Sequence, residues 1–277
     1  MIDIHTHLHP PKLFAAIRRW FGEHTPWDID GQPDDPAGVA AVLRDNGCER
    51  FVFCSYAHKP AMARELNAWL ARTSRELGGY GLPLATVHLD DAAYVRDLHD
   101  ALDDGCIGLK LHEDVQQLAA DDARFAPVYD ELARRGAFLL VHAGPIPWRY
   151  DPGAGISRVE RVLAARPDLN VVVAHLGTPD SGAYFALMDR YPRLHLDTTM
   201  VFAPGSPMHA APDLARFRAS IEAHPDRVLY GTDFPIMPHA YASESEGIAA
   251  LQLAPGVARA VFRDNAARLI EQASVAR

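Results

Sequence analysis

Short apolar segments recur along the whole chain and alternate with stretches of helical periodicity. The apolar segments are IDIHTH, RFVFCSYA, LATVHL, CIGLKLH, AFLLVHAG, NVVVAHLG, LHLDTT and RVLYGTDF. Stretches between them, such as PAMARELNAWLARTSREL and AAYVRDLHDALDDG, repeat apolar residues at helical spacing, and many close on Gly or Pro. Alternation of this kind predicts parallel strands joined by crossover helices.

The number of alternating units indicates the architecture. Eight strand segments with helices between them, spread over about 250 residues, are typical of a (β/α)8 barrel. A doubly wound open sheet is the alternative, but no glycine-rich phosphate-binding motif follows the first strand. We therefore predict one α/β domain over residues 1–277, folded as a TIM barrel. Residues 10–36 form a long irregular loop after the first strand, which we expect over the C-terminal face as a lid or substrate wall.

Composition and charge disfavour several classes of protein. The net charge of −9 disfavours nucleic-acid binding, which needs a basic face. The three cysteines are widely spaced and form no CxxC motif, so we expect a reducing, cytoplasmic location rather than a disulfide scaffold. No apolar run approaches the ~18 residues of a membrane span, and the N-terminus lacks the pattern of a signal peptide. The expected partner is a small-molecule substrate.

Several histidines and one aspartate fall at or near the ends of predicted strands. His5 and His7 lie in the first strand, His142 ends the fifth, His175 ends the sixth, and Asp233 ends the eighth. Strand ends of a barrel converge on one face, so these residues are expected to meet. Residues two apart on a strand share a face, which lets His5 and His7 bind one ion through neutral imidazoles.

Each of these residues alone could be an ordinary core histidine or a turn residue. Their coincidence favours a metal site, because polar groups inside apolar runs cost free energy unless they are paired or coordinated.

Motifs along the whole chain resemble those of the amidohydrolase superfamily. The segment DIHTH resembles its D-x-H-x-H start, and VVVAHLG and YGTDFP resemble its strand 6 and strand 8 signatures. CIGLKLHEDVQ and DNAARLI resemble segments of its amidohydrolase-related branch, the latter with Asp264 where Gly is common. That branch holds metal-dependent hydrolases and non-oxidative decarboxylases, and it often forms homodimers.

The resemblance implies a set of site residues. His5, His7, His142 and Asp233 are expected to bind one divalent metal ion, with zinc favoured. Asp233 is also expected to move the proton of a catalytic water. His175 is expected beside that water or the substrate rather than as a main ligand.

Lys110 and Trp148 are the expected substrate-binding residues. Lys110 could hold a substrate carboxylate, whereas in some superfamily members a lysine at this place is carbamylated and bridges two metals; pairing with Glu113 is a further alternative, and we favour one metal ion. Trp148 could form a wall for a ring. His112 is interpreted as facing away from Lys110, packed between barrel and helices.

The resemblance and the residues together predict a metal-dependent hydrolase of a small carbonyl compound, such as an amide or a lactone. The alternative is a metal-dependent decarboxylase of an aromatic or unsaturated carboxylic acid. The short chain favours hydrolysis, because the usual decarboxylases often carry insertions. A non-catalytic barrel that only binds or stores metal is the third hypothesis.

Overall fold

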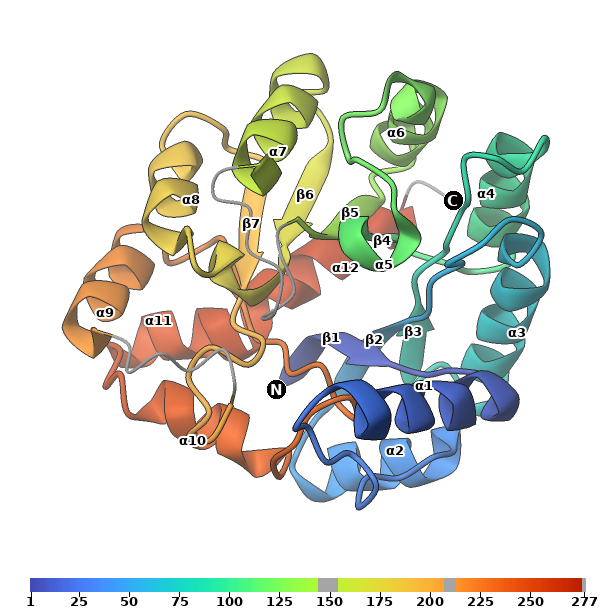
Figure 1. The fold of residues 1–277 in the computed structure, drawn as a ribbon. Helices are drawn as coiled ribbons and strands as arrows, with labels where there is room; N and C mark the ends of the chain where they lie inside the picture. The colour runs from blue at the N-terminus through green and yellow to red at the C-terminus, as the bar shows by residue number, and fades with distance from the viewer. Residues whose placement is uncertain (144–153, 207–212, 276–277) are drawn as a thin grey trace.

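Eight parallel strands form a ring in sequence order, with helices around it (Figure 1). The computed structural model describes residues 1–143, 154–206 and 213–275. The hydrogen-bonded strands form two sheets. One sheet contains β1 (Ile2–His7), β2 (Arg50–Cys54) and β3 (Gly81–Pro83). The other contains β4 (Gly108–His112), β5 (Phe138–His142), β6 (Asn170–Val173), β7 (Leu194–Asp197) and β8 (Val228–Leu229).

Backbone contacts join the two sheets to each other at both places where their edges meet. Ile4 N donates to Tyr230 O at 2.9 Å, which attaches β1 to the segment after β8. Ala85 forms a parallel bridge with Leu109, which attaches the segment after β3 to β4. The predicted (β/α)8 barrel is therefore confirmed.

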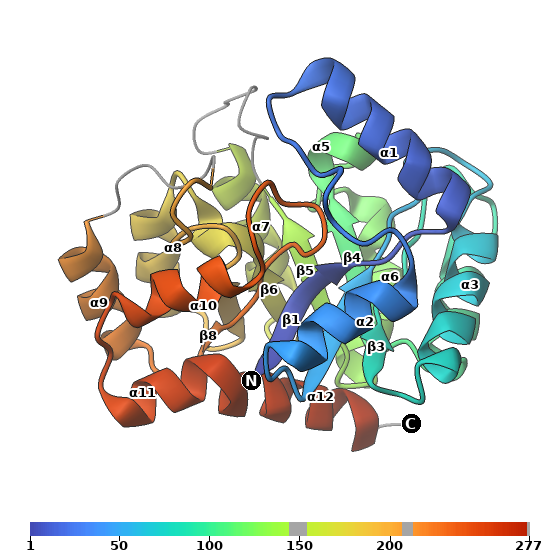
Figure 2. The same ribbon diagram turned by 90° about the horizontal axis from the view of Figure 1, so that it is seen from below.

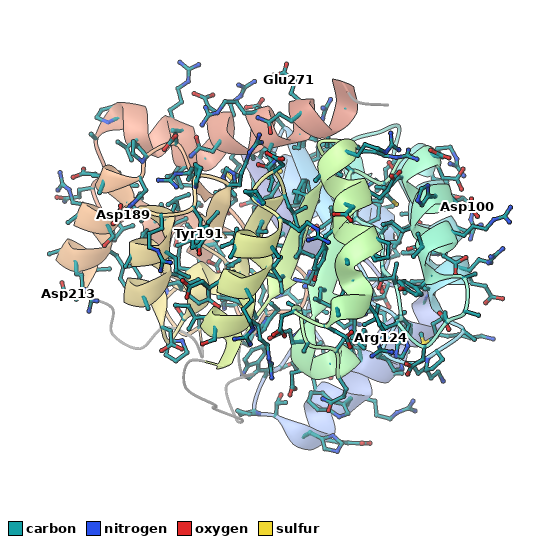
Figure 3. All side chains as sticks on the ribbon, turned by 90° about the horizontal axis from the view of Figure 1, so that it is seen from above. Asp100, Arg124, Asp189, Tyr191, Asp213 and Glu271 are labelled. Atoms are coloured by element: carbon teal, nitrogen blue, oxygen red, sulfur yellow. The ribbon has the colours of Figure 1, made fainter. Side chains whose placement is uncertain are left out.

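Helices cover the outside of the barrel. They are α2 (Pro36–Asp45), α3 (Ala63–Glu76), α4 (Tyr94–Asp103), α6 (Ala126–Arg134), α7 (Ala154–Ala165), α8 (Ser181–Met188), α9 (Leu214–Ala223) and α10 (Ala242–Ala249). Their apolar sides pack on the strands in a large buried cluster, while charged side chains such as Asp100 and Asp189 lie on the outer surface (Figure 3). Among the described residues, no helix combines the length and apolarity needed to cross a membrane.

The C-terminal helices close the N-terminal end of the barrel. α11 (Pro255–Arg259) continues through a π-helical segment (Ala260–Asp264) into α12 (Asn265–Val275), which lies across that end (Figure 2). Leu269 and Ile270 of α12 pack in one buried cluster with Ile2, Phe138 and Leu140 from the barrel interior, which we call the inner cluster. With this end filled, the opposite end of the strands is where a cavity can form.

An extra residue in β1 changes which side chains face the interior. Asp3 pairs with Phe51, which packs towards the helices, whereas His7 pairs with Cys54, which belongs to the inner cluster. Between these pairs the register shifts, so that β1 advances by one residue more than β2. This is a β-bulge, which re-aims side chains. Ile4 therefore faces inward below the bulge, and His7 faces inward above it.

The predicted irregular loop after the first strand contains a helix, α1 (Pro11–His24), so that part of the prediction is wrong. Pro11 occupies the first helical turn, where its missing N–H is not needed. Leu13, Ile17, Trp20 and Phe21 then follow at helical spacing. Figure 2 shows α1 over the end of the barrel at which the strands finish, where the segment was expected.

The predicted third strand, LATVHL, is also displaced. β3 ends at Pro83, and Ala85 makes only an isolated bridge. The backbone of Thr86 is instead satisfied by the side-chain amide of Asn67, which donates to its oxygen at 2.9 Å and accepts from its nitrogen at 2.8 Å. A side chain has here replaced the neighbouring strand as the hydrogen-bond partner.

Two substitutions on α12 test whether this helix forms part of the hydrophobic core at the N-terminal end of the barrel. Leu269→Ala should lower the free energy of unfolding by about 2–5 kcal/mol, because a large-to-small change leaves a cavity in the inner cluster. Glu271→Ala, on the exposed side of the same helix, should change it by less than about 0.5 kcal/mol. Urea denaturation followed by circular dichroism measures both. Equal effects would show that α12 is not part of the core.

Candidate active site

A cavity of about 610 Å³ lies between the strand ends and α1. The predicted site residues within the described part of the chain all line it: His5, His7, Lys110, His142, His175 and Asp233. Apolar and aromatic side chains of α1 form the facing wall: Leu13, Ala16, Ile17, Trp20 and Phe21. Trp148 lies outside the described residues. The polar floor and the apolar wall enclose one space.

Asp233 is the point on which the imidazoles converge. Its Oδ1 lies 3.0 Å from His5 Nε2 and 3.1 Å from His7 Nε2, and its Oδ2 lies 3.9 Å from His175 Nε2. Its backbone adopts a left-handed φ of 70°, and its N–H donates to His5 O at 2.9 Å. Burial favours the neutral acid, but the surrounding imidazoles hold the pKa of Asp233 well below its usual range.

His5 is held by a second buried carboxylate, Asp197. His5 Nδ1 donates to Asp197 Oδ2 at 2.9 Å, which leaves the lone pair on Nε2, facing Asp233. Asp197 Oδ1 accepts the backbone N–H groups of His175 and Thr199 at 2.9 and 3.1 Å. Burial alone would raise the pKa of Asp197, but the contact with His5 lowers it. The sequence pattern predicts no role for Asp197, although it ends β7 as His142 ends β5.

His7 has a different partner. Its Nδ1 lies 3.4 Å from Cys54 Sγ, on the opposite side of the ring from Asp233. Burial disfavours the charged imidazole, yet Cys54 and Asp233 outweigh it and raise the pKa of His7 to about 9. Burial and nearby Lys110 lower the pKa of His5 to about 4. The two histidines of the HxH pair therefore differ in their affinity for a proton.

His142 joins the cluster through His175. His175, at a left-handed φ of 58°, contacts Thr199 O through Nδ1 at 3.0 Å, which places its proton on Nδ1. Its Nε2 then accepts from His142 Nδ1 at 3.0 Å. This arrangement leaves the lone pair of His142 on Nε2, available to a ligand.

His112 lies in the cavity, so its predicted place between the barrel and the helices is wrong. It stacks on His142 with ring centroids 4.1 Å apart. Lys110 and His112 are two residues apart on β4, and such residues share a face of a strand. Alternation along β4 therefore places His112 on the same face as Lys110, and not on the opposite face as predicted from the sequence.

Lys110 is buried on the inner face of β4. Its Nζ lies 2.7 Å from His5 Nε2. Glu113, the alternative partner, instead accepts from Ala120 N at 2.7 Å and lies 3.4 Å from Arg158 Nη1. Lys110 therefore belongs to the cluster around Asp233 and not to a pair with Glu113.

The donor chemistry of this cluster fits a divalent ion. His5 Nε2 carries a lone pair that lies 3.0 Å from an Asp233 oxygen and 2.7 Å from the Lys110 ammonium, so this point already attracts positive charge and a divalent ion could take over the contact of the ammonium. His7 Nε2 approaches the same oxygen. A group of three side chains, His5, His7 and Cys54, also brings one potential ligand atom each within 4.8 Å of one another.

A family model described as Amidohydrolase matches residues 2–271. The chain belongs to the amidohydrolase family. Comparison with curated proteins gives no match.

Solved structures with the same fold are distant in sequence. An uncharacterised TIM-barrel protein from Bordetella bronchiseptica is 21% identical over 99% of each chain, with a TM-score of 0.74. A probable 2-pyrone-4,6-dicarboxylic acid hydrolase from Acinetobacter baumannii is 13% identical over 98% of each chain, with a TM-score of 0.68. A 5-carboxyvanillate decarboxylase from Novosphingobium aromaticivorans, with bound manganese, is 15% identical over 98% of this chain and 96% of its own, with a TM-score of 0.67. The family is one of metal-dependent enzymes. The two named structural neighbours are a probable hydrolase and a decarboxylase.

The pKa of His7 predicts a proton release. With a pKa of about 9 in the protein without metal, His7 is protonated at pH 7, whereas a ligand nitrogen must be deprotonated. Binding of Zn²⁺ at pH 7 should therefore displace about one proton from His7, and affinity should rise by up to about tenfold per pH unit towards pH 9. Isothermal titration calorimetry in buffers of different ionisation enthalpy measures this release. Release should fall in His7→Gln; an unchanged value would contradict the assignment.

Proposed function

We propose that this protein is a metal-dependent hydrolase of a small carbonyl compound, such as an amide, a lactone or a related carboxylic acid derivative. One observation carries the proposal: the Asp233 carboxylate directs one oxygen at His5 and His7 and the other towards His175. A carboxylate in this position can hold a cation with one oxygen and exchange a proton with the other.

In this proposal, His5, His7, His142 and Asp233 hold one divalent ion. Imidazole and carboxylate ligands suit zinc, which we favour, and they also suit manganese. When bound, such an ion supplies an electrophile that polarises a carbonyl oxygen and lowers the pKa of water towards ~7.

Three side chains of the protein have separate roles in proton transfer and substrate binding. Asp233 is ionised, so it takes a proton from the attacking water and delivers it to the leaving group. His175 is held by Thr199 O and, through its backbone N–H, by Asp197, so its Nε2 lies beside Asp233 and can accept a proton or a hydrogen bond from the attacking water. Lys110, buried beside His5, holds a carboxylate of the substrate.

A decarboxylase is the second candidate, favoured by the apolar wall. Leu13, Ile17 and Phe21 of α1 face the polar floor across the cavity, which suits a ring whose carboxylate lies at Lys110. In this reaction Asp233 or His175 would first take up a proton from water or from a substrate hydroxyl and then deliver it to the carbon that loses CO₂.

Replacement of Asp233 tests the core shared by both candidates. Asp233→Asn should lower kcat by about 10²–10⁴-fold, the contribution of a positioned acid–base group, and it should also lower metal content. Asp100→Asn, an exposed change on α4, should leave both as in the wild type. Metal analysis and steady-state kinetics measure these effects. Metal content near zero in the wild type, or an Asp233→Asn variant that matches it, would contradict the proposal.

The fate of the substrate separates the two reactions. A screen of lactones, amides and hydroxybenzoates in ¹⁸O-labelled water should give products that contain ¹⁸O, without release of CO₂. Release of CO₂ without incorporation of the label would refute hydrolysis and establish the decarboxylase.

A further inference from the structure

Cys54 contacts His7 on the side of the ring opposite to Asp233. It ends β2 on the inside of the barrel and is fully buried. Its Sγ lies 3.4 Å from His7 Nδ1 and 3.3 Å from Thr6 O. The thiol is therefore fixed between a ring nitrogen and a backbone carbonyl.

The hydrogens in this chain of contacts can be assigned. If His7 Nε2 is a ligand nitrogen, the single ring proton must lie on Nδ1. Cys54 Sγ is then its acceptor, and the S–H in turn donates to Thr6 O. Each hydrogen has one acceptor and the backbone carbonyl ends the chain, so no buried donor remains unpaired.

We propose that Cys54 is a positioning residue that keeps His7 in the Nδ1–H form and aims its Nε2 at the metal. The proposal rests on the metal site of the proposed function. Outer partners of metal-bound histidines are usually carboxylates, carbonyls or water, and His5 follows that rule through Asp197. At His7 the corresponding partner is the sulfur of Cys54.

The surroundings explain why a thiol suits this place. Cys54 packs in the inner cluster with Ile4, Val52 and Leu84. A carboxylate among these side chains would carry a large desolvation cost. A thiol is small and only weakly polar, so it accepts the N–H without that cost.

Direct coordination by Cys54 is the competing arrangement. His5, His7 and Cys54 do lie within the span of one small site. However, Sγ contacts the Nδ1 side of His7, whereas Asp233 contacts the Nε2 side. A single ion bound to His7 Nε2 and Asp233 therefore has the imidazole between it and the sulfur.

Metal affinity of matched variants tests the role of Cys54. Cys54→Ala should weaken Zn²⁺ binding by about 10–100-fold, the usual cost of losing an outer partner. Cys54→Ser retains an acceptor and should lose less. Cys48→Ala is the control, because Cys48 is also a buried thiol that donates to a carbonyl, but that carbonyl is Arg50 O at 3.0 Å and, among the described residues, its sulfur has no histidine contact like that of Cys54 with His7. Competition with a chromophoric chelator measures the Kd.

Two spectra of the wild type make the test independent of variant folding. Nitrogen-15 NMR of the Zn²⁺ form should show His7 with its proton on Nδ1. The Co²⁺ form should lack the strong charge-transfer band of a thiolate ligand. A thiolate band, an unprotonated Nδ1, or equal affinities of Cys54→Ala and Cys48→Ala would overturn the proposal. A wild type that binds no metal would overturn the proposed function as well, which distinguishes the two failures.

Discussion

One extra residue in β1 decides which side chains reach the cavity. Ile2 and Ile4 fill the barrel interior near the helix α12, and a regular strand would then send every odd residue outward. The bulge between Asp3 and Thr6 reverses this alternation, so that His7 faces inward beside Cys54. The same short strand thereby contributes to the core at one end and to the site at the other. Removing the bulged residue would return the HxH pair to the helix layer.

Two buried carboxylates and one thiol then set the chemistry of the imidazoles. Asp197 fixes the proton of His5 on the side away from the cavity, and its other oxygen holds the backbone of His175. Asp233 gathers the nitrogens of His5 and His7 around one oxygen. Because these groups come from β1, β2, β7 and the segment after β8, the closed ring of strands is itself a requirement for the site.

Much of the fold could be read from local patterns. Alternating apolar runs and helical stretches predicted the barrel, since crossover connections and parallel strands follow from local periodicity. The errors occurred where local signals were ambiguous. The helix that begins at Pro11 lies in a segment whose prolines and glycines favour a loop, although Leu13, Ile17 and Phe21 have helical spacing. The strand after Pro83 was misplaced because the amide of Asn67 replaces a strand partner, and no local pattern shows that exchange.

The sequence by itself determined the fold class and the family resemblance, and it placed the residues of the site in or after predicted strands: His5, His7, His142, His175 and Asp233. These depend on residue type and spacing, which the chain carries locally. Only the tertiary structure decided that Asp197 and Cys54 stand behind the histidines, that His112 joins the cavity and that Lys110 lies against His5. Such contacts depend on the register between strands far apart in the chain. The bulge sets that register in β1, and the sequence pattern did not reveal the bulge.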